Sequence, residues 1–462
     1  MARLYPFRAL RYDPTLVNMT DVVTQPYDKI TPEMQERYYQ ASPYNLIRVI
    51  LGKKYPTDTE EGENVYTRAA ATLNDWRAEG ILKEETEPAL FGYSQTYKVP
   101  GTEEIRERRG FIALGHLYDY ADKVVYRHEQ TFPKHKSDRL ALFKATRAYC
   151  EQIYMLYSDP TFTAETAIFE SGAAPELEIT DEYGVQHRVW KLTNPALIKL
   201  VLDAMADKWL LIADGHHRYE TSTTYMQERA AALGLDPKAP AQDLSSRPER
   251  SEVERPASPV AAQLPTPAFP EAAMMMTFVN IEAPGITILP THRVAFNLPN
   301  FSASEFAVKA EQYFTVETLP SAYGEADLLH KLNNTHGVAF IAATKDADFL
   351  LTSIPEAIAP LLAGLSPEKQ ALDVTQLHKV VLEQVLGLDE ETVRAGNNIK
   401  YLREASEAVD EVRTGKADVA FLIKPVTLDQ MKDISLKLDV MPQKSTDFYP
   451  KLLSGLAMYT LD

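Results

Sequence analysis

The sequence predicts an α+β protein, with a mixed sheet in the N-terminal part and an α/β arrangement in the C-terminal part. Three observations support this class. Segments with an apolar residue at every second position alternate with segments whose apolar residues recur at helical spacing. The chain has 462 residues, and about 150 residues per domain gives two or three domains. A stretch rich in proline, alanine, serine, glutamate and arginine, over 237–270, separates the two parts.

The first eighty residues contain two helix patterns. Prolines between residues 6 and 27 indicate loops and extended chain. A threonine followed by proline and glutamate then supplies an N-cap and a favoured first helical position, which predicts a helix over 31–40. Apolar residues at helical spacing, closed by a glycine, predict a second helix over 65–80.

Strands dominate the next part of the chain. Alternating patterns at 91–97 and 110–114, separated by a proline-glycine pair, predict an antiparallel hairpin. The apolar run 153–157 and the alternating run 185–192 predict two further strands. The run 209–213 predicts a buried strand that leads directly into a helix ending near residue 233.

These patterns predict three regions. We place an N-terminal domain at 1–235, a mobile insertion at 236–271 and a C-terminal domain at 272–462. The C-terminal domain is expected to begin with a strand at 274–279.

Composition restricts the environment and the partners. Sixty-five acidic against 48 basic residues give a formal charge of −17, which makes nucleic-acid binding an unlikely function because phosphates need a basic surface. The single cysteine, Cys150, forms no intramolecular disulfide and fits a reducing compartment. No signal-like or membrane-length apolar stretch is present, so we expect a soluble cytoplasmic protein without a membrane partner. The oligomeric state is left open.

The most chemically suggestive segment follows the strand 209–213 and reads Asp214-Gly215-His216-His217-Arg218. A helix N-terminus favours phosphate oxygens, and Arg218 and the histidines can donate hydrogen bonds to them. Asp214 can hold Mg²⁺ or orient a histidine. The alternative is a helix cap at Asp214, a turn at Gly215 and two surface histidines.

A second polar cluster lies between residues 126 and 139 and lacks an apolar stripe. We interpret Glu129 as a general base, because a carboxylate near a bound hydroxyl can take its proton. The expected phosphate contacts here are His128, Lys134, Lys136 and Arg139. A solvated charged turn is the alternative.

Two further groups are weaker candidates for anion contacts: His292 and Arg293, and Lys444, Ser445, Thr446 and Lys451. The second group resembles a fragment of a phosphate loop, but the glycine frame of a P-loop is missing. The alternative is an ordinary strand and turn at each place.

Several common enzyme classes lack their motifs in this sequence. Zinc is poorly supported, because Cys150 is isolated and neither a helical His-x₃₋₅-His pair nor an HExxH motif appears. The Gly-x-Ser-x-Gly elbow of serine hydrolases and the Gly-x-Gly-x-x-Gly fingerprint of dinucleotide binding are also missing.

Six motifs in order make the chain resemble the bacterial and archaeal family catalogued as domain of unknown function 1015, over Tyr5 to Gly455. They are Pro6-Phe7-Arg8-Ala9, Pro26-Tyr27-Asp28, His128-Glu129-Gln130-Thr131, Ala213 to Glu220, Leu289-Pro290-Thr291-His292-Arg293 and Pro442-Gln443-Lys444-Ser445-Thr446.

A shorter resemblance suggests a chemistry. The segment Asp214 to Arg218, after an apolar strand, looks like the signature of the free-serine kinases of the ParB/sulfiredoxin superfamily. This resemblance implies a ParB/sulfiredoxin-like core in the N-terminal sheet, with the segment at the nucleotide phosphates and the substrate. DNA binding and sulfiredoxin chemistry are not implied, since the chain is acidic and the segment has no cysteine.

Taken together, the motifs favour an enzyme of the small-molecule kinase type. The expected reaction is Mg²⁺-dependent phosphoryl transfer from ATP or ADP to a small hydroxylated metabolite, with free L-serine as a candidate acceptor. Asp214, His216, His217 and Glu129 are the expected catalytic residues, and Asp214 is the expected metal ligand. Two alternatives stay open: a nucleotide- or metabolite-binding regulator without turnover, and a metal-assisted phosphohydrolase.

Overall fold

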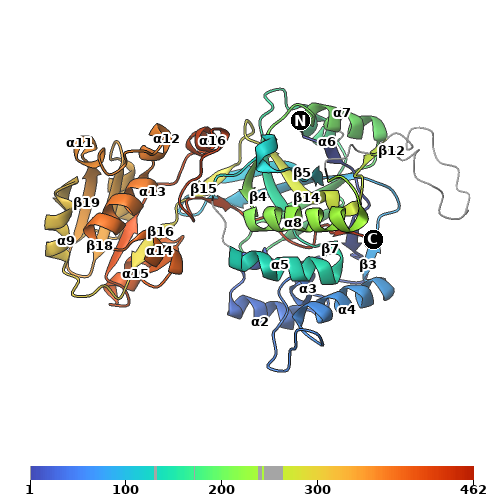
Figure 1. Cartoon of the computed structure of the whole chain (residues 1–462), viewed down its shortest axis with the longest axis horizontal. Coiled ribbons are helices and arrows are strands. Elements are labelled where there is room, and N and C mark those ends of the chain that lie inside the picture. Colours follow the sequence, from blue (N-terminus) through green and yellow to red (C-terminus); the bar gives the residue numbers. More distant parts are fainter. Residues whose placement is uncertain (1, 130–132, 171, 238–241, 244–263) are drawn as a thin grey trace, which may run out of the picture. The chain divides into compact units, whose positions relative to one another are not determined.

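The computed structural model describes residues 2–129, 133–170, 172–237, 242–243 and 264–462, and they form two compact units (Figure 1). The first unit comprises Met1–Arg127, Thr131–Thr287 and Pro450–Asp462. The second comprises His128–Gln130 and Ile288–Tyr449. The chain therefore leaves the first unit and returns to it twice.

The first unit is built on one mixed sheet with the order β6-β11-β8-β14-β5-β4-β10-β9, in which β1 also pairs with β5. The pairs β11–β6 and β14–β8 are parallel, and the other pairs are antiparallel. The strands are β1 (Leu4–Tyr5), β4 (Leu90–Lys98), β5 (Ile105–His116), β6 (Val125–Tyr126), β8 (Ile153–Tyr157), β9 (Leu177–Thr180), β10 (Gln186–Leu192), β11 (Leu210–Asp214) and β14 (Ala273–Asn280). Short pairs outside this sheet are β2 (Leu10–Tyr12) with β3 (Leu82–Glu84), β7 (Ala148–Tyr149) with β23 (Tyr459–Thr460), and β12 (Gln242–Asp243) with β13 (Pro265–Thr266).

Helices of the first unit begin at the start signals that the sequence contains. Thr31 accepts a hydrogen bond from the Met34 amide at the start of α2, and Asn64 forms a capping box at the start of α4. Helix α8 packs against α5, and α5 against α4, as the green, turquoise and blue layers of Figure 1 show. The helices are α1 (Met19–Val22), α2 (Pro32–Ala41), α3 (Ile47–Ile50), α4 (Val65–Ala78), α5 (Pro133–Thr146), α6 (Thr163–Phe169), α7 (Pro195–Met205) and α8 (His216–Leu233).

The core of the first unit follows from the alternation along its strands. Ile153, Met155 and Tyr157 of β8 join one buried cluster, together with Met276 and Phe278 of β14. Because neighbouring side chains of a strand point to opposite faces, every second residue contributes to the same cluster. This packing fixes the position at which β11 ends.

The second unit has a six-stranded sheet with the order β17-β19-β18-β21-β16-β20, and all its pairs are antiparallel. Phe340 and Ala342 of β18 enter one core cluster, and Ile341 and Ala343 enter another, so both faces of the sheet are covered. The strands are β16 (His292–Ala295), β17 (Phe314–Thr318), β18 (Ala339–Thr344), β19 (Asp348–Ser353), β20 (Ile399–Leu402) and β21 (Val419–Leu422); β22 (Asp447–Tyr449) also lies in this unit, and β15 (Thr287–Leu289) begins at the boundary.

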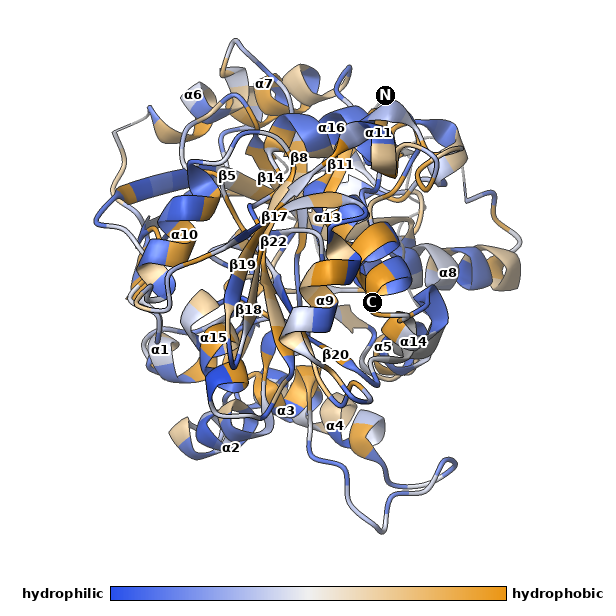
Figure 2. Ribbon diagram, turned by 90° about the vertical axis from the view of Figure 1, so that its left-hand side faces the viewer, coloured by the Kyte–Doolittle hydropathy of each residue, from blue (hydrophilic) through white to orange (hydrophobic). Residues whose placement is uncertain are grey.

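The helices of the second unit are amphipathic. Ala405, Ala408, Val409 and Val412 are buried along one face of α15, and Figure 2 shows hydrophilic and hydrophobic residues sharing this helix. The helices are α9 (Ala303–Ala310), α10 (Glu325–Asn333), α11 (Pro355–Ile358), α12 (Pro367–Gln370), α13 (Asp373–Gln376), the π-helix Leu377–Val385, α14 (Glu390–Ala395), α15 (Ala405–Arg413) and α16 (Leu428–Leu436).

The structure confirms a protein of mixed α and β class with a large mixed sheet, and it refines the boundary. The strand expected at 274–279 is β14, which pairs with β8 and β5 of the first unit. The division therefore falls after Thr287 and not at residue 272. Most of the insertion expected at 236–271 lies outside the described residues. None of the helices in the described part of the chain is long and apolar enough to cross a membrane.

Candidate functional site

The Asp214 segment lies where a buried strand meets a long helix. Strand β11 ends at Asp214, Gly215 follows with a φ of 94°, and α8 begins at His216. A φ of this sign suits glycine, and a Cβ at Gly215 would come within 3.2 Å of the Arg218 guanidinium. Gly215 makes no side-chain hydrogen bond to the start of α8, and the N-terminal end of a helix attracts anions.

Two cations hold the Asp214 carboxylate. The Lys451 ammonium lies 3.0 Å from Oδ1, and the Arg218 guanidinium donates to Oδ2 at 2.8 Å. Burial opposes ionisation of Asp214, but Lys451, Arg218 and Lys29 outweigh it and hold the pKa of the carboxyl well below its usual range. Asp214 is therefore ionised at neutral pH, in contact with two positive charges.

A second layer of buried groups orients Arg218. Its guanidinium also donates to the Gln152 carbonyl, and Glu151, 4% exposed, adds its charge. Burial raises the pKa of Glu151, although Arg218 and Arg139 act in the opposite direction. Glu151 accepts a hydrogen bond from the Tyr27 amide at 3.0 Å, and Arg139 lies over the Tyr27 ring. These contacts fix the plane of the Arg218 fork.

The two histidines occupy the first helical positions of α8. His216 is buried, 7% exposed, and His217 is half-buried. The His217 carbonyl accepts a hydrogen bond from the Thr221 hydroxyl, one turn along the helix. Both residues lie at the positive end of the helix dipole, as the sequence predicts.

Glu129 lies in the second unit, in a network with the 441–446 loop. The Ser445 amide donates to Glu129 Oε1 at 3.2 Å, and residue 129 forms a parallel bridge with Met441. His128 is fully buried, and its Nε2 lies 2.7 Å from the Thr446 hydroxyl. Two of the predicted clusters, His128 with Glu129 and Ser445 with Thr446, therefore meet in this unit.

Arg293 and His292 lie beneath that loop and not at a surface. Arg293 is fully buried, and its guanidinium donates to the carbonyls of Gln443 and Lys444 at 3.1 Å each. His292, 1% exposed, accepts a hydrogen bond from the Ile423 amide. Both side chains have structural partners, and the phosphate-binding role expected for them stays a prediction.

The remaining predicted cations differ in their surroundings. Arg139 is buried and bonded to the Ile50 carbonyl and to Asp138, which makes it part of the scaffold. The Lys136 ammonium pairs with Glu220. Lys444 is exposed. The side chain of Lys134 lies outside the described residues.

The donor set around Asp214 does not fit a Mg²⁺ ion held by the protein. Mg²⁺ requires near-octahedral oxygen ligands, usually carboxylates with phosphates and waters. Both oxygens of Asp214 instead contact cations. The described residues also contain no group of three or more His, Cys, Asp or Glu side chains placed to hold an ion. Asp214 is better placed as an anchor for cations than as a metal ligand.

The sequence interpretation missed Glu151, Gln152 and Lys29. Glu151 and Gln152 directly precede the wholly buried strand β8. Polar residues at the entrance to such a strand were a usable signal, because burial of a carboxylate requires partners. The contact between Lys451 and Asp214, 237 residues apart, had no local signal.

The fold and the Asp214 segment define a two-unit α and β protein with a positively charged strand-to-helix turn. Comparison with protein families identifies it further: the family described as Protein of unknown function (DUF1015) matches residues 4–375, and the chain belongs to this family. The predicted membership is thereby confirmed. The comparison with curated proteins found no match.

Solved structures similar to the chain include free serine kinases. A free serine kinase in complex with AMP is 13% identical, with 73% of this chain and 86% of the kinase covered and a TM-score of 0.32. A mutant free serine kinase in complex with ADP is 12% identical, with 76% and 90% covered and a TM-score of 0.33. Truncated SbnI from Staphylococcus aureus is 11% identical, with 74% and 85% covered and a TM-score of 0.35. Likeness at these TM-scores does not by itself define an activity.

Proposed function

We propose that the chain transfers a phosphoryl group from ATP or ADP, bound as the Mg²⁺ complex, to the hydroxyl of a small metabolite such as free L-serine. One observation carries the proposal: an ionised Asp214 holds Arg218 and Lys451 beside the uncapped N-terminus of α8. Arg218, Lys451 and the helix dipole place positive charge at this turn, beside the carboxylates of Asp214, Glu151 and Asp28. A polyphosphate is the ligand that such a turn favours.

The chain's residues would act mainly by positioning and electrostatics, as is usual in phosphoryl transfer. Arg218, Lys451, Gly215 and the two histidines would hold phosphate oxygens, and Lys444 is a further candidate. Arg218 matches phosphate geometry well, because its planar fork can donate two parallel hydrogen bonds.

Glu129 is the proposed general base. Its carboxylate would take the proton of the acceptor hydroxyl, while the hydroxyl oxygen bonds to the terminal phosphorus and the bond to the nucleotide's bridging oxygen breaks. The Ser445 amide donates a hydrogen bond to this carboxylate and holds its Oε1 in place.

Two further features of the protein, its core fold and its compartment, are part of the proposal. We also propose that the sheet of the first unit contains the ParB/sulfiredoxin-like core implied by the Asp214 segment. The protein would work in a reducing cytoplasm, where the thiol of its single, buried cysteine, Cys150, stays reduced.

Turnover and binding, measured separately, test the proposal. The purified chain is mixed with Mg²⁺, ATP or ADP, and L-serine; phosphoserine is followed by phosphorus NMR and nucleotide binding by calorimetry. We expect wild type to bind and turn over, Glu129→Gln to bind normally with at least about a hundredfold slower turnover, and Asp214→Asn to bind poorly. Glu107→Gln, a half-buried carboxylate paired with Arg109, is the matched control.

Three outcomes would overturn the proposal. Binding without turnover in wild type would favour the regulator, and release of inorganic phosphate without phosphoserine would favour the phosphohydrolase. Equal, poor nucleotide binding by wild type and Asp214→Asn would remove the site altogether.

A further inference from the structure

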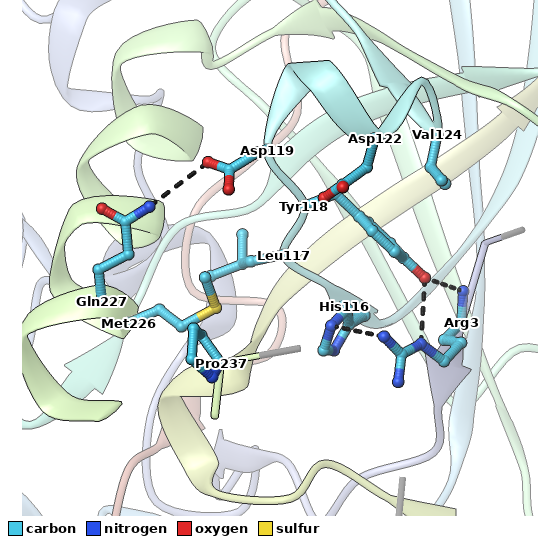
Figure 3. Close-up of a pocket in the computed structure, with 10 residues that line it drawn as sticks. All are labelled: Arg3, His116, Leu117, Tyr118, Asp119, Asp122, Val124, Met226, Gln227 and Pro237. Carbon is cyan, nitrogen blue, oxygen red and sulfur yellow. Dashed lines mark hydrogen bonds between the residues drawn. The ribbon is translucent and has the colours of Figure 1, made fainter. Parts of the chain in front are cut away.

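A second cavity, of about 220 Å³, lies in the first unit and shares no lining residue with the Asp214 cluster. Its walls come from the N-terminal strand segment, the end of β5, the loop 117–124 and the middle of α8 (Figure 3). A water molecule occupies about 30 Å³ in the liquid, so this space equals about seven waters. It suits a small metabolite better than a nucleotide.

One end of the cavity carries a positive charge. The Arg3 guanidinium donates to the Tyr118 hydroxyl through Nε at 3.3 Å and lies 3.0 Å from His116 Nε2 through Nη2. Burial lowers the pKa of His116 to about 4, and Arg3 lowers it further, so the ring is neutral at physiological pH. These two bonds orient the guanidinium without cancelling its charge.

The other end carries negative charge. Asp119 and Asp122 are exposed at the rim, and Asp119 accepts a hydrogen bond from the Gln227 amide. Asp119 follows Tyr118 in the chain, whereas the hydroxyl of Tyr118 meets Arg3. Figure 3 shows the Arg3 guanidinium at the Tyr118 hydroxyl, with Asp119 and Asp122 away from that hydroxyl.

The wall between the two charged ends is apolar. Leu117, Val124 and Met226 line the cavity and are 2%, 6% and 4% exposed. An apolar wall with a few convergent polar groups is the usual composition of a small-molecule site. The acidic rim would repel a phosphorylated ligand.

We propose that this cavity binds a small zwitterion, namely a free amino acid with an apolar side chain. Its carboxylate would pair with Arg3, its ammonium with Asp122, and its side chain would contact Met226. The guanidinium fork suits a carboxylate in particular. This second site does not depend on the proposed phosphoryl transfer.

Calorimetry on the full chain with three related probes tests the ligand class. L-Leucine has both charges, leucinamide lacks the carboxylate, and 4-methylpentanoate lacks the ammonium. We expect L-leucine to bind with a Kd of about 1 mM or tighter, and each analogue at least about tenfold more weakly. Similar affinity for all three compounds, or no binding of L-leucine at about 10 mM, overturns the proposal.

Two variants test the site with matched controls. Arg3→Gln and Asp122→Asn should each weaken L-leucine binding by about tenfold or more. Arg109→Gln and Asp203→Asn remove exposed charges of the same sign that pair elsewhere in the first unit, and should leave the affinity unchanged. Because Asp122 is exposed, its variant should fold even if Arg3→Gln does not. If a folded Asp122→Asn protein binds L-leucine with wild-type affinity, the assignment of the acidic end is overturned. This holds whatever the result for Arg3→Gln.

Discussion

At the scale of single residues, the chain places ionisable groups where their surroundings decide their charge. Asp214 stays ionised because Lys451 and Arg218 contact its two oxygens. Glu151 interacts electrostatically with the same arginine. Its pKa is raised because the effect of burial exceeds that of the neighbouring positive charges. Neighbouring carboxylates with opposite shifts are a frequent feature of functional sites, since each proton-transfer role needs its own pKa.

Asp214→Asn should destabilise the first unit by about 3 kcal/mol, because it leaves two partly buried cations without their carboxylate. Thermal unfolding at pH 7 measures this. Since the folded pKa lies below its usual value, the contribution of Asp214 is complete above about pH 4 and is lost as the pH falls further. The control Asp203→Asn, an exposed i,i+4 partner of Lys199, should cost about 0.5 kcal/mol or less. Equal losses for both variants would contradict the role given to Asp214.

Asp373→Asn should have the opposite effect. Burial raises the pKa of Asp373 to about 6, with Lys424 opposing, and its Oδ2 has no hydrogen-bond partner in the described structure. Wild type therefore loses stability as the pH rises from about 4 to about 6, by up to about 3 kcal/mol. The variant should lack this loss, so its Tm should exceed that of wild type at pH 7.5 and the difference should vanish near pH 4. A constant difference across this range would refute the assignment.

Residue types and spacing identified part of the candidate site. The Asp214 segment was found because a carboxylate, a glycine and three cationic or imidazole groups follow an apolar strand. His292 and Arg293 were harder to interpret, because a polar trio beside an apolar strand looks the same in sequence whether it faces solvent or fills a core. Only tertiary contacts, such as the carbonyls that surround Arg293, distinguish the two cases.

At the scale of elements, side chains that contact the backbone hold two segments in place. They are the turn between β11 and α8 and the loop 441–446. The turn needs a positive φ at Gly215 and close approach to Arg218. The loop is held from below by Arg293 and from the other side by Glu129, which accepts from the Ser445 amide. In both places a buried side chain fixes the backbone that forms the candidate site.

Gly215→Ala should reduce nucleotide binding and destabilise the protein by about 1–2 kcal/mol, because alanine is strained at this φ and its Cβ would displace Arg218. Gly234→Ala, at the other end of α8, is a matched control: φ is 65° and the space around it is open. The control should cost about 1 kcal/mol in stability and leave binding unchanged. Equal binding by the two variants would show that the Gly215 turn is not at the site. Calorimetry and thermal unfolding supply both measurements.

Arg293→Met should loosen the loop 441–446. Burial lowers the pKa of Arg293 to about 10, yet the side chain stays charged at pH 7 and donates to two loop carbonyls. Its loss leaves those carbonyls unpaired, at a cost of about 1–3 kcal/mol each. Hydrogen exchange at the Ser445 amide should become faster. Arg413→Met, which removes an arginine bonded to Asp348 at another place in the same unit, should destabilise without this local effect. Unchanged exchange in Arg293→Met would argue against the loop contact.

Local signals predicted most elements well. The helices at 31–40 and 65–80 and the strands of the first sheet appear close to their expected positions, because caps, glycine stops and period-two patterns are local. The C-terminal part was expected to have an α/β arrangement, but its sheet is antiparallel. Strand pairing depends on partners far away in sequence, which alternation alone does not reveal.

At the scale of the whole molecule, neither unit is continuous in sequence. The first unit needs Pro450–Asp462, and the second contains His128–Gln130. The boundary expected at residue 272 was placed by composition, whereas the fold places it where β14 completes the first sheet. Composition identifies the stretch at 237–270. It cannot show that the strand after this stretch pairs with strands that precede it in the sequence.

Removal of residues 450–462 should unfold the first unit. This segment contributes Lys451 to Asp214 and pairs β23 with β7. It also buries the apolar side chains of Leu452, Leu453, Leu456, Met458 and Leu461. At about 2 kcal/mol for each side chain, the loss is about 10 kcal/mol, comparable with the whole stability of a domain. Circular dichroism of the truncated chain should show lost cooperative unfolding. A truncated protein with the wild-type Tm would contradict this. The variant Lys451→Met removes only the charge, so it separates that effect from the loss of the buried apolar side chains.

The return of the C-terminus to the first unit also sets an order for biosynthesis. A ribosome that has released residue 449 has delivered every segment of the second unit, while the unit that emerged first still lacks its closing segment. Until residues 450–462 follow, the apolar surface that receives them is exposed to chaperones and to other nascent chains. The first unit is thus completed after the second.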